Sequence, residues 1–127
     1  MTQKVTIEVQ GYGAVEAHEG ERLVLALERG GVDILHRCGG MAKCTTCRVS
    51  FQEGEPDSMT VAEYDKLTEK DLLGQARLSC QIECVAGMKV TPLQTVQSTG
   101  LEAGKTPGDA IQPDPQWTTR PGASTEG

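Results

Sequence analysis

The sequence predicts one α+β domain of the β-grasp (ubiquitin-like) type, with a mixed sheet, one main helix and short helices. Three observations predict it. Apolar and polar residues alternate near the start of the chain, a helical apolar stripe follows, and further alternating segments come after it. The expected order of elements is therefore ββαβαβ. At 127 residues the chain is long enough for one modest core.

The first three elements are two strands and the main helix. Residues 4–9 alternate between polar and apolar side chains, which predicts a half-buried strand. The run Gly11-Tyr12-Gly13 predicts a turn, and residues 14–18 return as the second strand of a hairpin. Residues 21–29 carry a helical stripe that includes Leu23 and Leu27, and Gly30-Gly31 predicts the end of this helix.

The second half of the domain is predicted from weaker patterns. Residues 48–51 alternate as a third strand that ends around Gly54. Thr60 and Glu63 have the spacing of a capping box, which predicts a helix from Thr60, and a further short turn ends at Gly74. Residues 76–82 and 88–91 are the candidate closing strands.

From Leu93 onward the chain is rich in Thr, Gly, Pro, Gln and Ser, and its apolar residues are scattered. We therefore divide the chain into a domain at 1–92 and a C-terminal tail at 93–127, which cannot bury a core of its own. The alternative is an arm that packs back on the domain or on a neighbouring subunit through its apolar residues, which are Leu93, Val96, Leu101, Ile111 and Trp117.

The cysteines are the most informative residues for function. Cys38, Cys44 and Cys47 form a C-x5-C-x2-C run, and Cys80 follows after 32 intervening residues. Three thiolates on a loop and a fourth from a distant segment can enclose a small iron-sulfur cluster. Structural zinc is an alternative, although zinc motifs usually come as two C-x2-4-C pairs, and thiol or disulfide chemistry is another.

Together with the run Arg77-Leu78-Ser79-Cys80-Gln81, this spacing resembles the 2Fe-2S ferredoxins of the adrenodoxin and bacterial type over roughly residues 3–92. The plant-type pattern has four residues between the first two cysteines, whereas this chain has five. The resemblance implies a β-grasp ferredoxin fold that holds a 2Fe-2S cluster near the surface. Its implied cofactor and metal ligands are Cys38, Cys44, Cys47 and Cys80.

The resemblance implies a one-electron carrier that takes electrons from a ferredoxin reductase and passes them to an acceptor enzyme. The sequence shows no phosphate-binding glycine motif, flavin site or nucleophile-base pair, so we expect an electron-transfer protein rather than an enzyme. A cluster-bearing redox sensor or interaction module, and a structural zinc protein, are the alternative functions.

The formal net charge of -6 disfavours nucleic acid as a partner and favours a basic protein surface. Seven acids and two lysines lie between residues 53 and 71. In the resembled family an acidic helix in this region docks redox partners, and long-range attraction is the physical basis. We expect Asp65, Glu69 and Asp71 to dock the partner.

The remaining candidates are assigned structural roles. Cys84 is expected to be a small buried apolar residue rather than an alternative ligand. His36 lies two residues before Cys38 and is assigned to loop structure, and His18 to the surface, since neither has ligand spacing.

Location and assembly are predicted from the same sequence. It shows no import signal and no apolar run of about 18 residues that could span a bilayer. We therefore expect a soluble cytoplasmic monomer that has no contact with a membrane.

Overall fold

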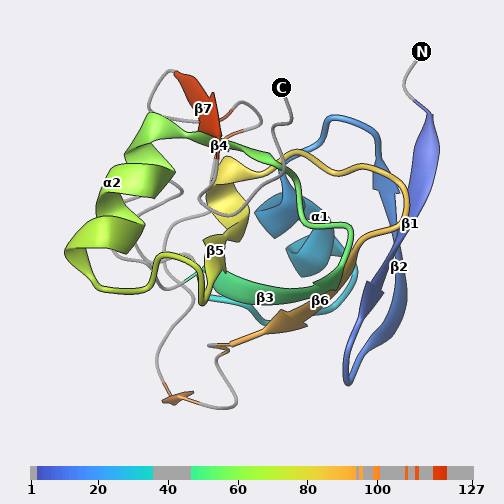
Figure 1. Cartoon of the computed structure of the whole chain (residues 1–127). Coiled ribbons are helices and arrows are strands. Elements are labelled where there is room, and N and C mark those ends of the chain that lie inside the picture. Colours follow the sequence, from blue (N-terminus) through green and yellow to red (C-terminus); the bar gives the residue numbers. More distant parts are fainter. Residues whose placement is uncertain are drawn as a thin grey trace.

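The largest element of the fold is a five-stranded mixed sheet (Figure 1). A computed structural model of the chain describes residues 3–35, 47–93, 95, 99–100, 108, 111 and 116–119. The strand order is β2-β1-β6-β3-β5, in which β1 and β6 are parallel and the other neighbours are antiparallel. The strands are β1 (Lys4–Val9), β2 (Gly13–His18), β3 (Arg48–Glu53), β5 (Arg77–Leu78) and β6 (Lys89–Pro92).

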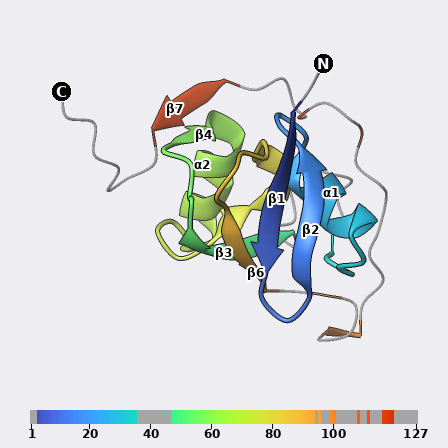
Figure 2. The same cartoon turned by 90° about the vertical axis from the view of Figure 1, so that its right-hand side faces the viewer.

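Two helices flank the centre of the molecule. Helix α1 (Leu23–Arg29) lies against the sheet, and α2 (Val61–Glu69) lies at the opposite side of the molecule from the β1-β2 hairpin (Figure 1, Figure 2). The 3₁₀ turn η1 (Ser79–Gln81) runs between the two helices. This arrangement confirms the predicted mixed sheet with helices, although α1, predicted as the main helix, has 7 residues and α2 has 9. It places the segment around Cys80 at the centre of the molecule (Figure 1).

The hairpin and α1 follow the predicted pattern closely. Strands β1 and β2 pair from Lys4 with His18 to Val9 with Gly13, and their apolar side chains face α1 and the core. Helix α1 ends where predicted, because Gly31 adopts a φ of +95° that favours glycine and the Val32 N–H reaches back to the Leu27 carbonyl at 2.9 Å.

The prediction of one strand over residues 76–82 is wrong. Only Arg77 and Leu78 pair with β3, and the chain then turns into η1. The Ser79 N–H and hydroxyl both donate to the Cys47 carbonyl, at 3.1 and 2.7 Å, and the N–H bond lies at the next position of the β3–β5 register. The short strand therefore ends at this contact between distant segments, where η1 begins.

The predicted helix start at Thr60 is confirmed, and the structure adds a strand before it. The Thr60 hydroxyl accepts the Glu63 N–H at 3.0 Å, which is the N-terminal cap of α2. Strand β4 (Ser58–Thr60) precedes the cap and was not predicted. It pairs antiparallel with β7 (Trp117–Thr119).

Strand β7 shows that part of the C-terminal segment packs on the domain. Ile111 is buried, Thr95 forms a bridge with Ile34, and Trp117 pairs through its backbone while its side chain is half exposed. These contacts match the arm described in the sequence analysis at the positions that the structure describes. Leu93 is exposed, and Val96 and Leu101 lie outside the described residues. The division at 92/93 stays a prediction.

The described helices give no sign of a membrane span. None of them is both long enough and apolar enough to cross a bilayer.

Candidate functional site

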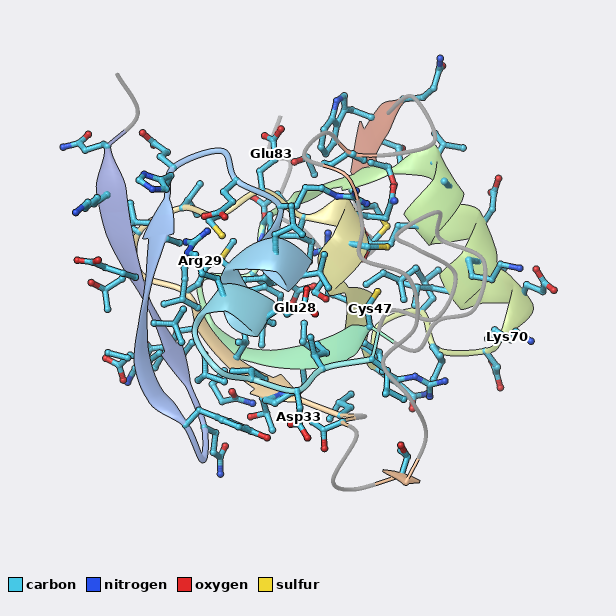
Figure 3. All side chains as sticks on the ribbon, turned by 180° about the vertical axis from the view of Figure 1, so that it is seen from behind. Glu28, Arg29, Asp33, Cys47, Lys70 and Glu83 are labelled. Carbon is cyan, nitrogen blue, oxygen red and sulfur yellow. The ribbon has the colours of Figure 1, made fainter. Side chains whose placement is uncertain are left out.

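Two of the four predicted ligands, Cys47 and Cys80, lie side by side in the core. The Cys80 N–H donates to Cys47 Sγ at 3.4 Å, although the two residues are 33 positions apart. Cys47 is 3% exposed and Cys80 is fully buried. Cys47 lies beside η1, between α1 and α2 (Figure 3). The other two predicted ligands, Cys38 and Cys44, and His36 lie outside the described residues.

This pair of thiols suits a positively charged group rather than free thiolates. The neighbouring Cys80 thiol and complete burial hold the pKa of the Cys47 thiol well above its usual range. Two thiolates at this place therefore require compensating positive charge, which the iron of a cluster supplies when its ligands are deprotonated. The residues present fit such a group, because each described sulfur also has a hydrogen-bond donor.

The second sulfur donor comes from Gln81, whose side-chain amide donates to Cys80 Sγ at 3.6 Å. The orientation of this amide is fixed from the other side, because the buried Thr60 hydroxyl donates to Gln81 Oε1 at 2.7 Å. Thr60 also caps α2. A continuous chain of hydrogen bonds therefore runs from the start of α2 to the Cys80 sulfur.

Arg77 joins the same segment to α2 through a buried ion pair. Its guanidinium donates to both carboxylate oxygens of Glu63, at 2.7 and 3.1 Å, and the Leu78 N–H donates to Glu63 Oε2 at 2.8 Å. It also reaches the carbonyls of Pro56 and Ser58. Burial raises the pKa of the Glu63 carboxyl, and the Arg77 guanidinium opposes that rise. The pair fixes the residues immediately before Cys80.

Glu63 was counted in the sequence analysis with the acids of the 53–71 stretch, and the structure removes it from the surface. Its side chain is fully buried against Arg77. The predicted capping box is therefore only half correct. Thr60 caps the helix, but the Glu63 carboxylate accepts hydrogen bonds from Arg77 rather than from the Thr60 N–H.

The three predicted docking residues are all exposed, and they lie on or just after α2. Lys66 Nζ donates to Glu69 Oε1 at 2.8 Å, and this contact lowers the pKa of the Glu69 carboxyl. Asp71 follows the helix at a φ of +61°. Docking of a partner at Asp65, Glu69 and Asp71 stays a prediction.

Cys84 is fully buried, as expected for a small apolar side chain. Its backbone is held by Glu21 and Gly20, through hydrogen bonds of 2.7 and 2.9 Å. Burial raises the pKa of the Cys84 thiol to about 12, so this thiol stays protonated at neutral pH.

Arg22 was missed by sequence reasoning. It is 1% exposed, and its Nε and one terminal nitrogen donate to the Cys80 carbonyl at 3.0 and 2.7 Å. Arg22 lies inside the helix predicted over residues 21–29, but α1 begins only at Leu23, so Arg22 occupies the N-cap position where Ser, Thr, Asp or Asn is normally found. Arginine there indicates that the side chain has a different task.

Comparison with known protein families supports iron-sulfur chemistry for this chain. A family model described as a 2Fe-2S iron-sulfur cluster binding domain matches residues 7–85, more than half of the chain. A 2Fe-2S ferredoxin of Haemophilus influenzae is 39% identical over 80 residues, which are 58% of this chain and 66% of that protein.

Two further comparisons extend the likeness to a larger protein and to a solved structure. One component of the Na(+)-translocating NADH-quinone reductase of Klebsiella pneumoniae is 32% identical over 71 residues, or 56% of this chain, and the match spans only 17% of that component. The structure of a reduced cysteine-to-serine variant of putidaredoxin from Pseudomonas putida superposes with a TM-score of 0.52 at 27% identity. That match covers 73% of this chain and 99% of putidaredoxin.

Proposed function

This chain belongs to the family of 2Fe-2S iron-sulfur cluster binding domains, and on that basis we propose that it carries single electrons from a reductase to an acceptor enzyme. The observation that supports this most directly is the convergence of Cys47 and Cys80. They come from segments far apart in the sequence, yet they lie in contact and each sulfur has a donor.

When bound, a 2Fe-2S cluster supplies a centre that takes up and releases one electron. In this proposal Cys47 and Cys80 bind iron together with Cys38 and Cys44. The Cys80 N–H and the Gln81 amide stabilise negative charge on the sulfurs, which favours the reduced state. Burial of both cysteines keeps water from their side of the site.

Anaerobically purified protein tests the cofactor directly. We expect a brown protein with two irons and two sulfides per chain. It should have no electron paramagnetic resonance signal when oxidised and a signal after dithionite reduction. A colourless protein that contains zinc would contradict the proposal.

We further propose that the reductase docks over the exposed acids of α2. These acids lie on the helix whose first residues connect, through Thr60 and Gln81, to the Cys80 sulfur. A basic surface on the partner would be attracted to this side of the molecule before contact, which raises the rate of association.

Charge reversal tests the docking surface. Asp65→Lys combined with Asp71→Lys should lower kcat/KM for reduction by the reductase by roughly tenfold at low salt, and it should flatten the salt dependence. The matched control is Glu8→Lys combined with Glu16→Lys, on the exposed hairpin across the molecule (Figure 2). Equal effects of the two pairs would overturn docking at α2, and the visible spectrum should be unchanged in both.

The reductase relative favours a second candidate, in which the chain is the electron-transfer unit of a larger reductase assembly. The support is the match to part of the NADH-quinone reductase component in Klebsiella pneumoniae. Size measurement of the native protein separates the two candidates: a 13.6 kDa species that turns over with an added reductase favours the free carrier.

A cytoplasmic, monomeric and non-enzymatic protein completes the proposal. The compartment is supported by Cys47, Cys80 and Cys84, which form no disulfide, because a reducing compartment preserves such thiols for metal binding.

A further inference from the structure

Arg22 makes contacts that connect three separate parts of the chain. It occupies the N-cap position of α1, where its backbone is extended and its side chain makes no capping bond. The guanidinium instead turns inward. Two of its nitrogens donate to the Cys80 carbonyl, and the third donates to the Gly108 carbonyl at 2.9 Å.

We propose that Arg22 is a positioning residue for the iron-sulfur site, which fixes the backbone of the ligand Cys80 and fastens it to the C-terminal arm. This inference rests on the proposed function for its cofactor. The contact with Gly108 is notable because this residue lies beyond the 7–85 match to the family model. The arm therefore supports the site through the Arg22 side chain.

The two hydrogen bonds from Arg22 fix the orientation of a whole peptide group, not only the position of the Cys80 carbonyl oxygen. Arginine donates from a rigid planar fork, so two bonds to one carbonyl oxygen restrict the rotation of the peptide group after Cys80. The orientation of that peptide in turn limits where Cys80 Sγ can lie. The next residue is Gln81, whose amide donates to the same sulfur, so a shift of the Cys80 peptide would also misplace this donor.

The positive charge adds an electrostatic effect. A buried cation bonded to the backbone of a ligand favours the state of the site that carries one more electron, and the interaction is stronger in a buried environment than in water. Arg22 should therefore raise the reduction potential. A residue that only stabilises the fold would leave the potential unchanged.

The test measures the reduction potential of the holoprotein with three variants. Arg22→Gln should lower the equilibrium constant for reduction about tenfold, which corresponds to about 59 mV for one electron. Arg22→Lys keeps the charge but not the fork, so it should retain most of the potential while losing the cluster several times faster in air. Arg29→Gln is the control, because this arginine lies on the same helix but its side chain is half exposed.

The attachment of the arm has its own readout. Trypsin cleaves after Lys105, three residues before Gly108, whose carbonyl accepts a hydrogen bond from Arg22. Cleavage after Lys105 should be several times faster in Arg22→Gln than in the Arg29→Gln control. If Arg22→Gln does not fold, faster cluster loss and faster cleavage in Arg22→Lys support the proposal, and unchanged rates overturn it.

Other outcomes are equally decisive. An Arg22→Gln protein with the same potential as the control would overturn the electrostatic role. Unchanged cluster loss in Arg22→Lys would overturn positioning. A wild-type protein that binds no cluster would instead contradict the proposed function, so the two failures are distinguishable.

Discussion

Replacing Cys80 with Ala is expected to abolish the cluster. Cys80 is the predicted ligand from the second segment, and its loss leaves the cluster with only three protein thiolates. Because metal binding contributes to the free energy of folding, the variant should also be markedly less stable than the holoprotein. Iron and sulfide content, visible absorption and the melting temperature measure these effects. We expect less than about a tenth of the wild-type iron content.

Cys84→Ala provides the matched control. Cys84 is also a buried cysteine, four residues further along, but its contacts are with Glu21 and Gly20. Removing its sulfur should cost about 1 kcal/mol of stability through the small cavity and leave the cluster intact. A Cys84→Ala protein without iron, or a Cys80→Ala protein with a normal spectrum, would contradict the ligand assignment.

Replacing Arg77 with Met is expected to have the largest effect on stability outside the ligands. The substitution leaves the fully buried Glu63 carboxylate without its guanidinium partner, and breaking such a pair typically costs about 3–5 kcal/mol. Thermal unfolding of the holoprotein should therefore shift downward by on the order of 10 °C or more. The cluster should also be lost faster, because the residues before Cys80 are no longer held to α2.

Two further variants separate the buried charge from general damage. Combining Arg77→Met with Glu63→Leu removes both charges, and it should recover much of the lost stability. Lys66→Met disrupts the exposed pair with Glu69 on the same helix and should leave the melting temperature nearly unchanged. A double variant as unstable as Arg77→Met would show that the other contacts of Arg77, with Glu55 and with the carbonyls of Pro56 and Ser58, matter more than its pair with Glu63.

Local patterns predicted the fold well where contacts are local. The alternation in residues 4–9, the glycines after α1 and the Thr60 cap each depend on neighbours within a few positions, and each was confirmed. The strand predicted over residues 76–82 failed for the opposite reason. There the conformation is set by Cys47, more than 30 positions away, whose carbonyl takes the hydrogen bonds of Ser79.

The site shows the same division between local and distant information. Cysteine spacing identified the family and predicted the ligand set, because the cofactor imposes that spacing on the chain. The supporting residues Arg22, Glu63 and Arg77 could not be assigned from spacing, since each acts on a segment far away in the sequence. The sequence holds one indication, for Arg22, because a charged side chain occupies a position where a small polar residue usually caps a helix.

The parallel pairing of β1 with β6 has a consequence for biosynthesis. The second neighbour of strand β1 in the sheet, β6, is synthesised about 80 residues after β1. Until then the early hairpin exposes an unpaired edge that can recruit other chains. Cys80 is translated shortly before β6, so the sheet closes at the same stage at which the last predicted ligand arrives.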